Sequence, residues 1–186
     1  MIFGSGYFFQ IRWQDRFINA PVDENIFVSV DGTDYKITEP KPFNPGWYSH
    51  KFKGPGLRYE IAIAIHTGYI VWVHGPFPCG QYSDRRIVRL ALHGALLPGE
   101  QYIADSGYRD RNSPALTPTG HNNDVERKRA VIRARHEVVN RRLKQFAVLG
   151  HKFRHDREKH AIAFRAVANV TQLMMVVEEP MWDIDG

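Results

Sequence analysis

The chain has 186 residues, of which 43% are hydrophobic, enough to bury the core of one domain. Its formal charge of +5 and its pI of about 9.4 favour polyanionic partners. The single cysteine, Cys79, excludes an internal disulfide and suits a reducing compartment, and the sequence predicts neither a signal peptide nor a membrane-spanning run.

The first half of the chain predicts strands. Residues 1–25 have no clear period, and we interpret them as an N-terminal segment compatible with the remnant of an upstream region. A β-rich run at 26–30 stops at the turn signal DGTD, which begins at Asp31. Residues 59–65 alternate, with large side chains on one face, and 69–74 are expected to form their hairpin partner.

The second half of the chain is expected to form three helices and two further strands. The order of elements over the whole chain predicts an α/β fold with a mixed five-stranded sheet flanked by helices, as in ribonuclease H-like folds. The expected elements are a helix at 83–96 capped by Ser83 or Asp84, a strand at 101–104, a very short strand near Leu116, and helices at 124–149 and 160–177.

Two aspartates follow predicted strands. Asp31 is expected at the carboxyl end of the first strand and Asp105 at the end of the fourth. If these strands are parallel neighbours, both carboxylates lie at the sheet edge where ligand sites occur. Their repulsion would then be relieved by a cation such as Mg²⁺, which prefers oxygen ligands. The alternative is that both are turn residues, since each precedes a glycine within two positions.

One glutamate in the helix at 124–149 is surrounded by bases. Glu137 has Arg133 and Arg141 at four-residue spacing, with Lys144 next along the same face. This pattern suits a metal ligand beside a track of phosphates, but it also suits an exposed face with ordinary ion pairs. Glu126 is the competing acid, although it leaves less room between Asp105 and the helix.

Several motifs together resemble the catalytic domain of PIF/Harbinger-type DDE transposases. VDGTDYKITEP contains Asp31, and YIADSGYRD contains Asp105 before Ser-Gly-Tyr. YSHKFKGPGLRYEIAIAI resembles the family's Lys-Gly turn and second strand, and HGPFPCGQYSDRRI its Pro-Gly loop running to an aspartate, here Asp84. RARHEVVNRRLKQFAVLGHKFRH, which contains Glu137, resembles the third catalytic motif.

The resemblance implies a DDE nuclease domain at 26–186 with Asp31, Asp105 and Glu137 as catalytic residues and metal ligands. It implies two Mg²⁺ or Mn²⁺ ions, with Asp31 bridging both and the other two acids each nearer to one. The implied reaction is phosphodiester hydrolysis and strand transfer by a DNA endonuclease or transposase. Asp84 does not match a metal ligand, and we interpret it as a helix cap.

The resemblance also implies partners. DNA is the expected substrate, and a separate Myb-like DNA-binding protein is an expected partner. A homodimer is one expected assembly. No membrane association is expected, and the expected location is the nucleus if the host is eukaryotic. Family members usually carry an N-terminal DNA-binding region, and residues 1–25 are too short for one. The residues expected to bind the DNA backbone are Arg133, Arg141, Arg142 and Lys144.

Three functions therefore remain open. The first is an active DDE nuclease, which the presence of all three acids favours. The second is a catalytically inactive, domesticated descendant that keeps the fold as a DNA- or protein-binding module. The third is an unrelated basic α/β binding protein. The distances among the three carboxylates in a structure would separate the first from the others.

Overall fold

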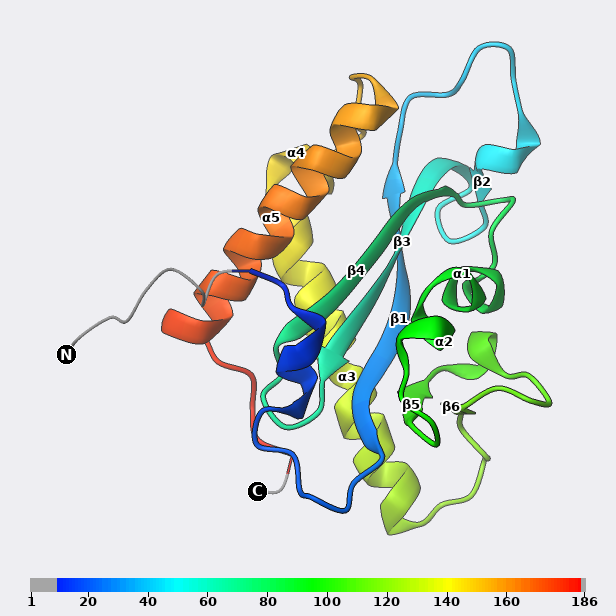
Figure 1. The fold of residues 1–186 in the computed structure, drawn as a ribbon. Helices are drawn as coiled ribbons and strands as arrows, with labels where there is room; N and C mark the ends of the chain where they lie inside the picture. The colour runs from blue at the N-terminus through cyan, green and yellow to red at the C-terminus, as the bar shows by residue number, and fades with distance from the viewer. Residues whose placement is uncertain (1–9, 185–186) are drawn as a thin grey trace.

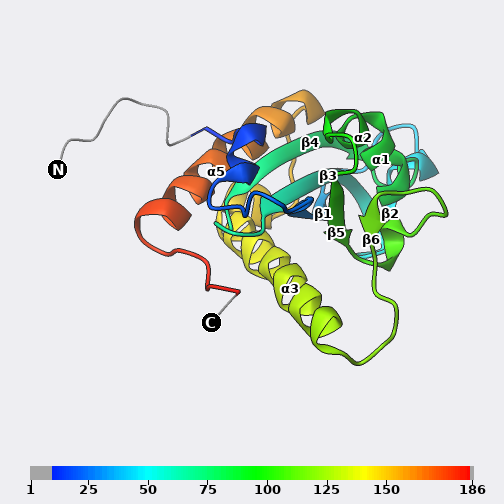
Figure 2. The same cartoon turned by 60° about the horizontal axis from the view of Figure 1, so that its bottom comes forward.

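The computed structural model describes residues 10–184. Its strands form one mixed sheet with helices on both faces (Figures 1 and 2). The elements, with 3₁₀ helices written η, are η1 (Trp13–Phe17), β1 (Ile26–Lys36), η2 (Pro45–Trp47), β2 (Tyr48–Ser49), β3 (Gly54–Ala64), β4 (Ile70–Pro78), α1 (Asp84–Leu90), α2 (Leu92–Ala95), β5 (Gln101–Ala104), η3 (Ser106–Tyr108), β6 (Ala115–Leu116), α3 (Asp124–Gln145), α4 (Ala147–Gly150) and α5 (Arg157–Val177).

The sheet confirms the predicted mixed α/β architecture, with six strands where about five were expected. β3 pairs antiparallel with β1 on one side and with its hairpin partner β4 on the other. β1 pairs in parallel with β5, and β5 pairs in parallel with β6. The additional strand is the two-residue β2, which pairs with the start of β3. The strands that carry or precede Asp31 and Asp105 are thus parallel neighbours, as predicted.

The prediction that the first strand ends at Asp31 is wrong. β1 continues to Lys36 and stays paired with β3 as far as the Lys36–Gly56 pair. Pairing satisfies the backbone polar groups of this segment, and that outweighs the local preference of Asp and Gly for a turn. Asp31 therefore lies in the middle of a strand. β3 and β4 likewise extend into the predicted Pro/Gly loops, since β3 begins at Gly54 and β4 runs to Pro78.

Alternate side chains of the sheet enter two separate cores. The large-residue face predicted for 59–65 is confirmed, because Tyr59, Ile61 and Ile63 are buried against α3 and α5. The opposite face is also covered, by α1, α2 and η1, and it carries the small residues of β3 (Figure 2). Residues packed on that second face include Val28, Val30, Ala62, Ala64, Val88 and Leu92.

The helices were predicted in the right order, but two of them are interrupted. The helix expected at 83–96 is divided at Ala91 into α1 and α2, and the division places Leu92 in the core with no exposed surface. The helix expected at 124–149 is divided at Phe146 into α3 and α4. α5 begins at Arg157, three residues before the predicted start, and it ends at Val177 as expected.

The described part of the N-terminal segment packs on the domain. The ring of Trp13 lies edge-on to that of Trp72, with centroids 5.4 Å apart. The guanidinium of Arg16 donates two hydrogen bonds to the Glu100 carboxylate, at 2.9 and 3.1 Å, and both side chains are buried. Residues 10–25 are therefore joined to the domain that follows them, and their derivation from an upstream region stays a prediction.

One helix differs from the expectation that no segment could cross a membrane. By length and composition alone, α5 is long and apolar enough to do so. Its buried face includes Phe164, Ala168 and Met175, which belong to the core between α5 and the sheet. Arg165 interrupts the apolar run near its centre. Packing in a core accounts for the apolar character of this helix.

Candidate active site

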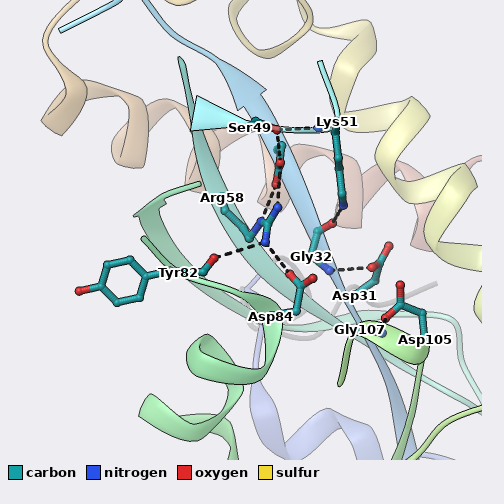
Figure 3. A network of polar contacts seen from close by, with 10 residues as sticks. Asp31, Gly32, Ser49, Lys51, Arg58, Tyr82, Asp84, Asp105 and Gly107 are labelled. Carbon is teal, nitrogen blue, oxygen red and sulfur yellow. Dashed lines mark hydrogen bonds and ion pairs between the residues drawn. The ribbon is translucent and has the colours of Figure 1, made fainter. Parts of the chain in front are cut away.

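Asp31 is a half-buried carboxylate in the middle of the sheet. Its neighbour Val30 pairs with Ala104 of β5, so Asp31 lies beside the residue that follows β5. Burial raises the pKa of Asp31 to about 6; the Lys51 ammonium and a hydrogen bond from the Gly32 amide oppose this rise. That bond joins the Gly32 nitrogen to Asp31 Oδ1 at 2.7 Å (Figure 3).

Asp105 comes directly after β5 and is exposed. Its Oδ1 accepts a hydrogen bond from the Gly107 amide at 2.8 Å and so caps η3. Asp105 is therefore a turn residue that is still available as a metal ligand, because the hydrogen bond that caps η3 uses only one of its two carboxylate oxygens. Its charge contributes to the raised pKa of Asp31, which places the two carboxylates within electrostatic reach of each other.

Glu137 joins these two aspartates, and Glu126 does not. The charge of Glu137 also raises the pKa of Asp31. Glu126 lies in the first turn of α3, eleven residues and roughly 16 Å along the helix from Glu137. There its carboxylate pairs with Arg129 at 2.9 Å. Of the two competing acids, the fold brings Glu137 to the aspartates.

The orientation of α3 depends on a buried histidine. His136 is 4% exposed, and its Nε2 lies 3.0 Å from the hydroxyl of Ser29 on β1. Burial lowers the pKa of His136 to about 4, so the imidazole is neutral near pH 7. This contact links α3 to the strand that carries Asp31. Glu137, one residue further, is thereby turned toward the edge of the core at Asp31.

The three acids line one cavity. Its volume is about 180 Å³, and its remaining lining residues are Val30, Arg133 and His136. One buried nitrogen of Arg133, Nη1, has no hydrogen-bond partner among residues 10–184. The cavity thus combines three carboxylates with a guanidinium donor, which is an arrangement suited to a cation and an anion bound side by side.

The donor chemistry fits the divalent ions that the sequence predicts, although the side chains are not preassembled. Carboxylate oxygens are the ligands that Mg²⁺ and Mn²⁺ prefer. Within residues 10–184, however, no group of three or more His, Cys, Asp or Glu side chains is arranged to hold a metal ion. Asp31 and Asp105 each turn one oxygen to a backbone amide. Rotation of these side chains and of the exposed Glu137 is needed to bring their oxygens together.

A buried ionic network lies beside Asp31, and sequence reasoning missed it. Arg58 of β3 donates to both oxygens of Asp34, at 2.7 and 3.0 Å, and it lies 3.2 Å from Asp84 (Figure 3). The hydroxyl of Ser49 also donates to Asp34, at 2.6 Å. Arg58 and Ser49 hold the pKa of Asp34 below its usual value in spite of burial. The network ties β1, β2, β3 and α1 together.

The interpretation of Asp84 as a helix cap is wrong. The N-cap residue of α1 is Ser83, which makes no side-chain capping bond, and Asp84 is the first helical residue. The Asp84 carboxylate points toward Arg58 and packs over β1, where a Cβ added at Gly32 would lie 2.2 Å from its Oδ1. A buried guanidinium is a stronger partner for this carboxylate than the amides of one helical turn. A side chain at position 32 would displace this carboxylate, and glycine leaves room for it.

The four predicted DNA-binding residues do not share one surface. Arg133 lines the cavity of the three acids, and Lys144 lines a larger neighbouring groove. Arg141 is exposed. Arg142 turns away, since its guanidinium donates to the backbone oxygen of Glu179 at 2.7 Å and lies 3.3 Å from the Glu179 carboxylate. Arg142 is therefore separated from the expected basic stripe, and the role of the other three residues in DNA binding stays a prediction.

Comparison with known proteins identifies the family of this chain. A family model described as "DDE superfamily endonuclease" matches residues 30–176, a range that includes all three acids. The chain is also similar to a probable transposase for insertion sequence element IS702 from Microchaete diplosiphon, with 25% identity over 181 residues. That match covers 87% of this chain and 62% of the relative. Since the family model spans most of the fold, the chain belongs to the DDE superfamily endonuclease family.

Proposed function

We propose that this chain is the catalytic domain of a metal-dependent DNA endonuclease or transposase, which hydrolyses phosphodiester bonds and transfers strands. The observation that carries the proposal is the meeting of Asp31, Asp105 and Glu137, from three separate elements, around one cavity. Membership of the endonuclease family and similarity to a probable transposase support it.

In this proposal Asp31, Asp105 and Glu137 would hold the two ions, since all three carboxylates line the same cavity. When bound, two Mg²⁺ or Mn²⁺ ions supply activation of the attacking oxygen and stabilisation of the leaving oxygen in an in-line displacement at phosphorus. The carboxylates offset the cation charge and fix the ion positions. Arg133 provides a guanidinium donor for the phosphate beside them.

Finer assignments belong to the same proposal. The motifs support the PIF/Harbinger branch, while the similarity to an insertion-sequence transposase supports the wider family. If the chain belongs to the Harbinger branch, we expect a separate Myb-like DNA-binding partner, a homodimeric assembly, and a nuclear location in a eukaryotic host. Mass measurement of the purified chain, alone and with DNA, tests the assembly.

The proposal is tested by incubating the purified chain with supercoiled plasmid and Mg²⁺, Mn²⁺ or Ca²⁺. Nicking or cutting is expected with the first two ions. Ca²⁺ is expected to bind without supporting cleavage, because its longer bonds and looser geometry suit paired octahedral sites poorly. Absence of metal-dependent cleavage under all of these conditions, with and without the DNA-binding partner, contradicts the proposal.

A catalytically inactive binding module is the second candidate function. The observation that favours it is that two of the three acids hydrogen-bond to backbone amides and that no preassembled metal cluster exists in the described part of the chain. Metal titration separates the two candidates. A nuclease is expected to bind Mn²⁺ in a manner that depends on all three acids, whereas a binding module is expected to bind DNA equally with and without the ion.

Arg141→Ala is expected to weaken DNA binding and to lower the slope of log affinity against log salt by about 1, because one phosphate contact and its released counterion are lost. Arg142→Ala is the matched control. Its side chain is engaged with Glu179 on another face, so the slope is expected to stay the same. Fluorescence anisotropy across a salt series measures both. Equal slopes for the parent and both variants would place the DNA elsewhere.

A further inference from the structure

Lys51 brings a positive charge to the site from an element other than α3. It belongs to the turn between β2 and β3, and its Nζ donates a hydrogen bond of 2.7 Å to the backbone oxygen of Gly32, next to Asp31 (Figure 3). Its positive charge acts on Asp31, Asp34 and Asp84. Lys51 is therefore a cation that acts on all three of these carboxylates, whereas Arg58 pairs with Asp34 and Asp84.

A groove of about 600 Å³ extends from the carboxylates between this turn and α3. Asp31 and Glu137 line it at the catalytic cavity, whose lining they share. Lys51 and Phe52 contribute one wall and Lys144 the other. The volume lies in the range of small-ligand sites, which is the size of a nucleotide.

The two lysines act on each other across this groove. Burial and the Lys51 charge both lower the pKa of the Lys144 ammonium. Two ammonium groups held near one another repel, and an anion between them converts the repulsion into two attractions. A DNA phosphate is such an anion, and its strand must reach the nearby carboxylates to be cut.

We propose that Lys51 and Lys144 form a two-sided seat for one phosphate of the DNA strand next to the scissile bond. This inference rests on the proposed function and deepens it, because it gives the strand a path between α3 and the β2–β3 turn. The basic face of α3 supplies one wall only. Lys51 supplies the other, and the apolar lining at Phe52 lies against the sugar and base of the same nucleotide.

The seat is tested with a short fluorescent DNA duplex in Ca²⁺ buffer, where binding is measured without cleavage. Lys51→Gln is expected to weaken binding about tenfold and to lower the salt slope by about 1. Lys51→Arg is expected to restore most of the affinity, since the charge is kept. Lys53→Gln is the matched control, because Lys53 is exposed on the same turn and does not line the groove.

A double-mutant cycle tests whether one phosphate is shared. Lys51→Gln and Lys144→Gln together are expected to cost less than the two single changes added, since the second change acts on a contact already weakened. Additive losses would overturn the shared seat. A purely structural Lys51, which balances acids and anchors β1, would lower the melting temperature of Lys51→Gln while leaving its salt slope unchanged, and that result also overturns it.

Cleavage of plasmid by the parent separates this inference from the proposed function. If the parent cuts DNA and Lys51→Gln binds with the parental affinity and slope, the seat is wrong and the nuclease stands. If the parent never cuts DNA, but Lys51→Gln and Lys144→Gln weaken DNA binding as described, the phosphate site is supported and the proposed nuclease activity is contradicted.

Discussion

Asp31→Ala, Asp105→Ala and Glu137→Ala are each expected to lower the rate of metal-dependent DNA cleavage by roughly a thousandfold or more. When several groups act as one catalytic unit, the loss of any one of them removes most of the rate enhancement. Each change removes oxygen ligands from the same small cavity. Asp→Asn and Glu→Gln are expected to be nearly as harmful, because an amide keeps the shape of the side chain but not the charge that offsets a divalent cation. Plasmid nicking in Mn²⁺ measures the effect.

Glu126→Ala is the matched control for this series. Glu126 lies on the same helix, but its carboxylate pairs with Arg129 far from the cavity, so activity is expected to stay within about twofold of the parent, because distant sites usually act independently. Melting temperatures should show that the three site variants remain folded. Removing one of several clustered acids relieves repulsion in the metal-free protein. A Glu137→Ala variant that cuts like the parent, beside an inactive Glu126→Ala, would show that the third carboxylate is wrong.

Glu60→Gln is expected to remove a large part of the pH dependence of stability. Glu60 lies on β3 with no exposed surface, and one of its oxygens accepts a hydrogen bond from Trp72 Nε1 at 3.0 Å. Burial raises the pKa of Glu60 to about 8; the Trp72 bond opposes this rise and the Asp84 charge adds to it. The folded protein therefore keeps a proton on Glu60 near pH 7 that the unfolded chain releases.

The sign follows from proton uptake on folding. Between the ordinary pKa of 4.5 and the folded value of about 8, the native state binds more protons than the unfolded state, so the free energy of unfolding falls as pH rises. The loss across this window is on the order of 4 kcal/mol. Glutamine keeps the acceptor for Trp72 and carries no proton equilibrium, so the variant is expected to gain stability at pH 8.

Urea unfolding of the parent and of Glu60→Gln between pH 5 and 8.5 checks this prediction. Glu39→Gln is the control, because Glu39 is exposed in a loop and its substitution is expected to leave the pH profile unchanged. Parallel profiles for the parent and Glu60→Gln would show that Glu60 is not the group responsible.

Much of this protein can be predicted from its sequence, because the deciding signals are local. Alternation over residues 59–65 predicts a strand with one large-residue face, and the structure confirms it. The order of strands and helices predicts the mixed sheet. The resemblance of several motifs to a known family points to Asp31, Asp105 and Glu137, and the structure brings these residues to one cavity. Their catalytic role remains a prediction.

Only the tertiary structure decided the surroundings of these acids. Turn preference at Asp31 predicted a strand end, but pairing with β3 carries β1 past it to Lys36. Capping preference placed Asp84 at a helix end, but a guanidinium 26 positions earlier, that of Arg58, attracts its carboxylate. Neither outcome has a local signature, because each depends on a partner that another element supplies.

The same reason explains why the groove could not be predicted. Lys51 and Lys144 are 93 positions apart, and each alone is an ordinary basic residue in a basic chain. Lys144 reaches the groove through the packing of α3 on the sheet, and Lys51 reaches it from the β2–β3 turn through its bond to the Gly32 oxygen. The sequence by itself determined the element order, which local periodicity encodes, and its resemblance to a known family pointed to the three acids. The tertiary structure decided which distant charges face them, because burial and charge pairing depend on the positions of all the elements at once.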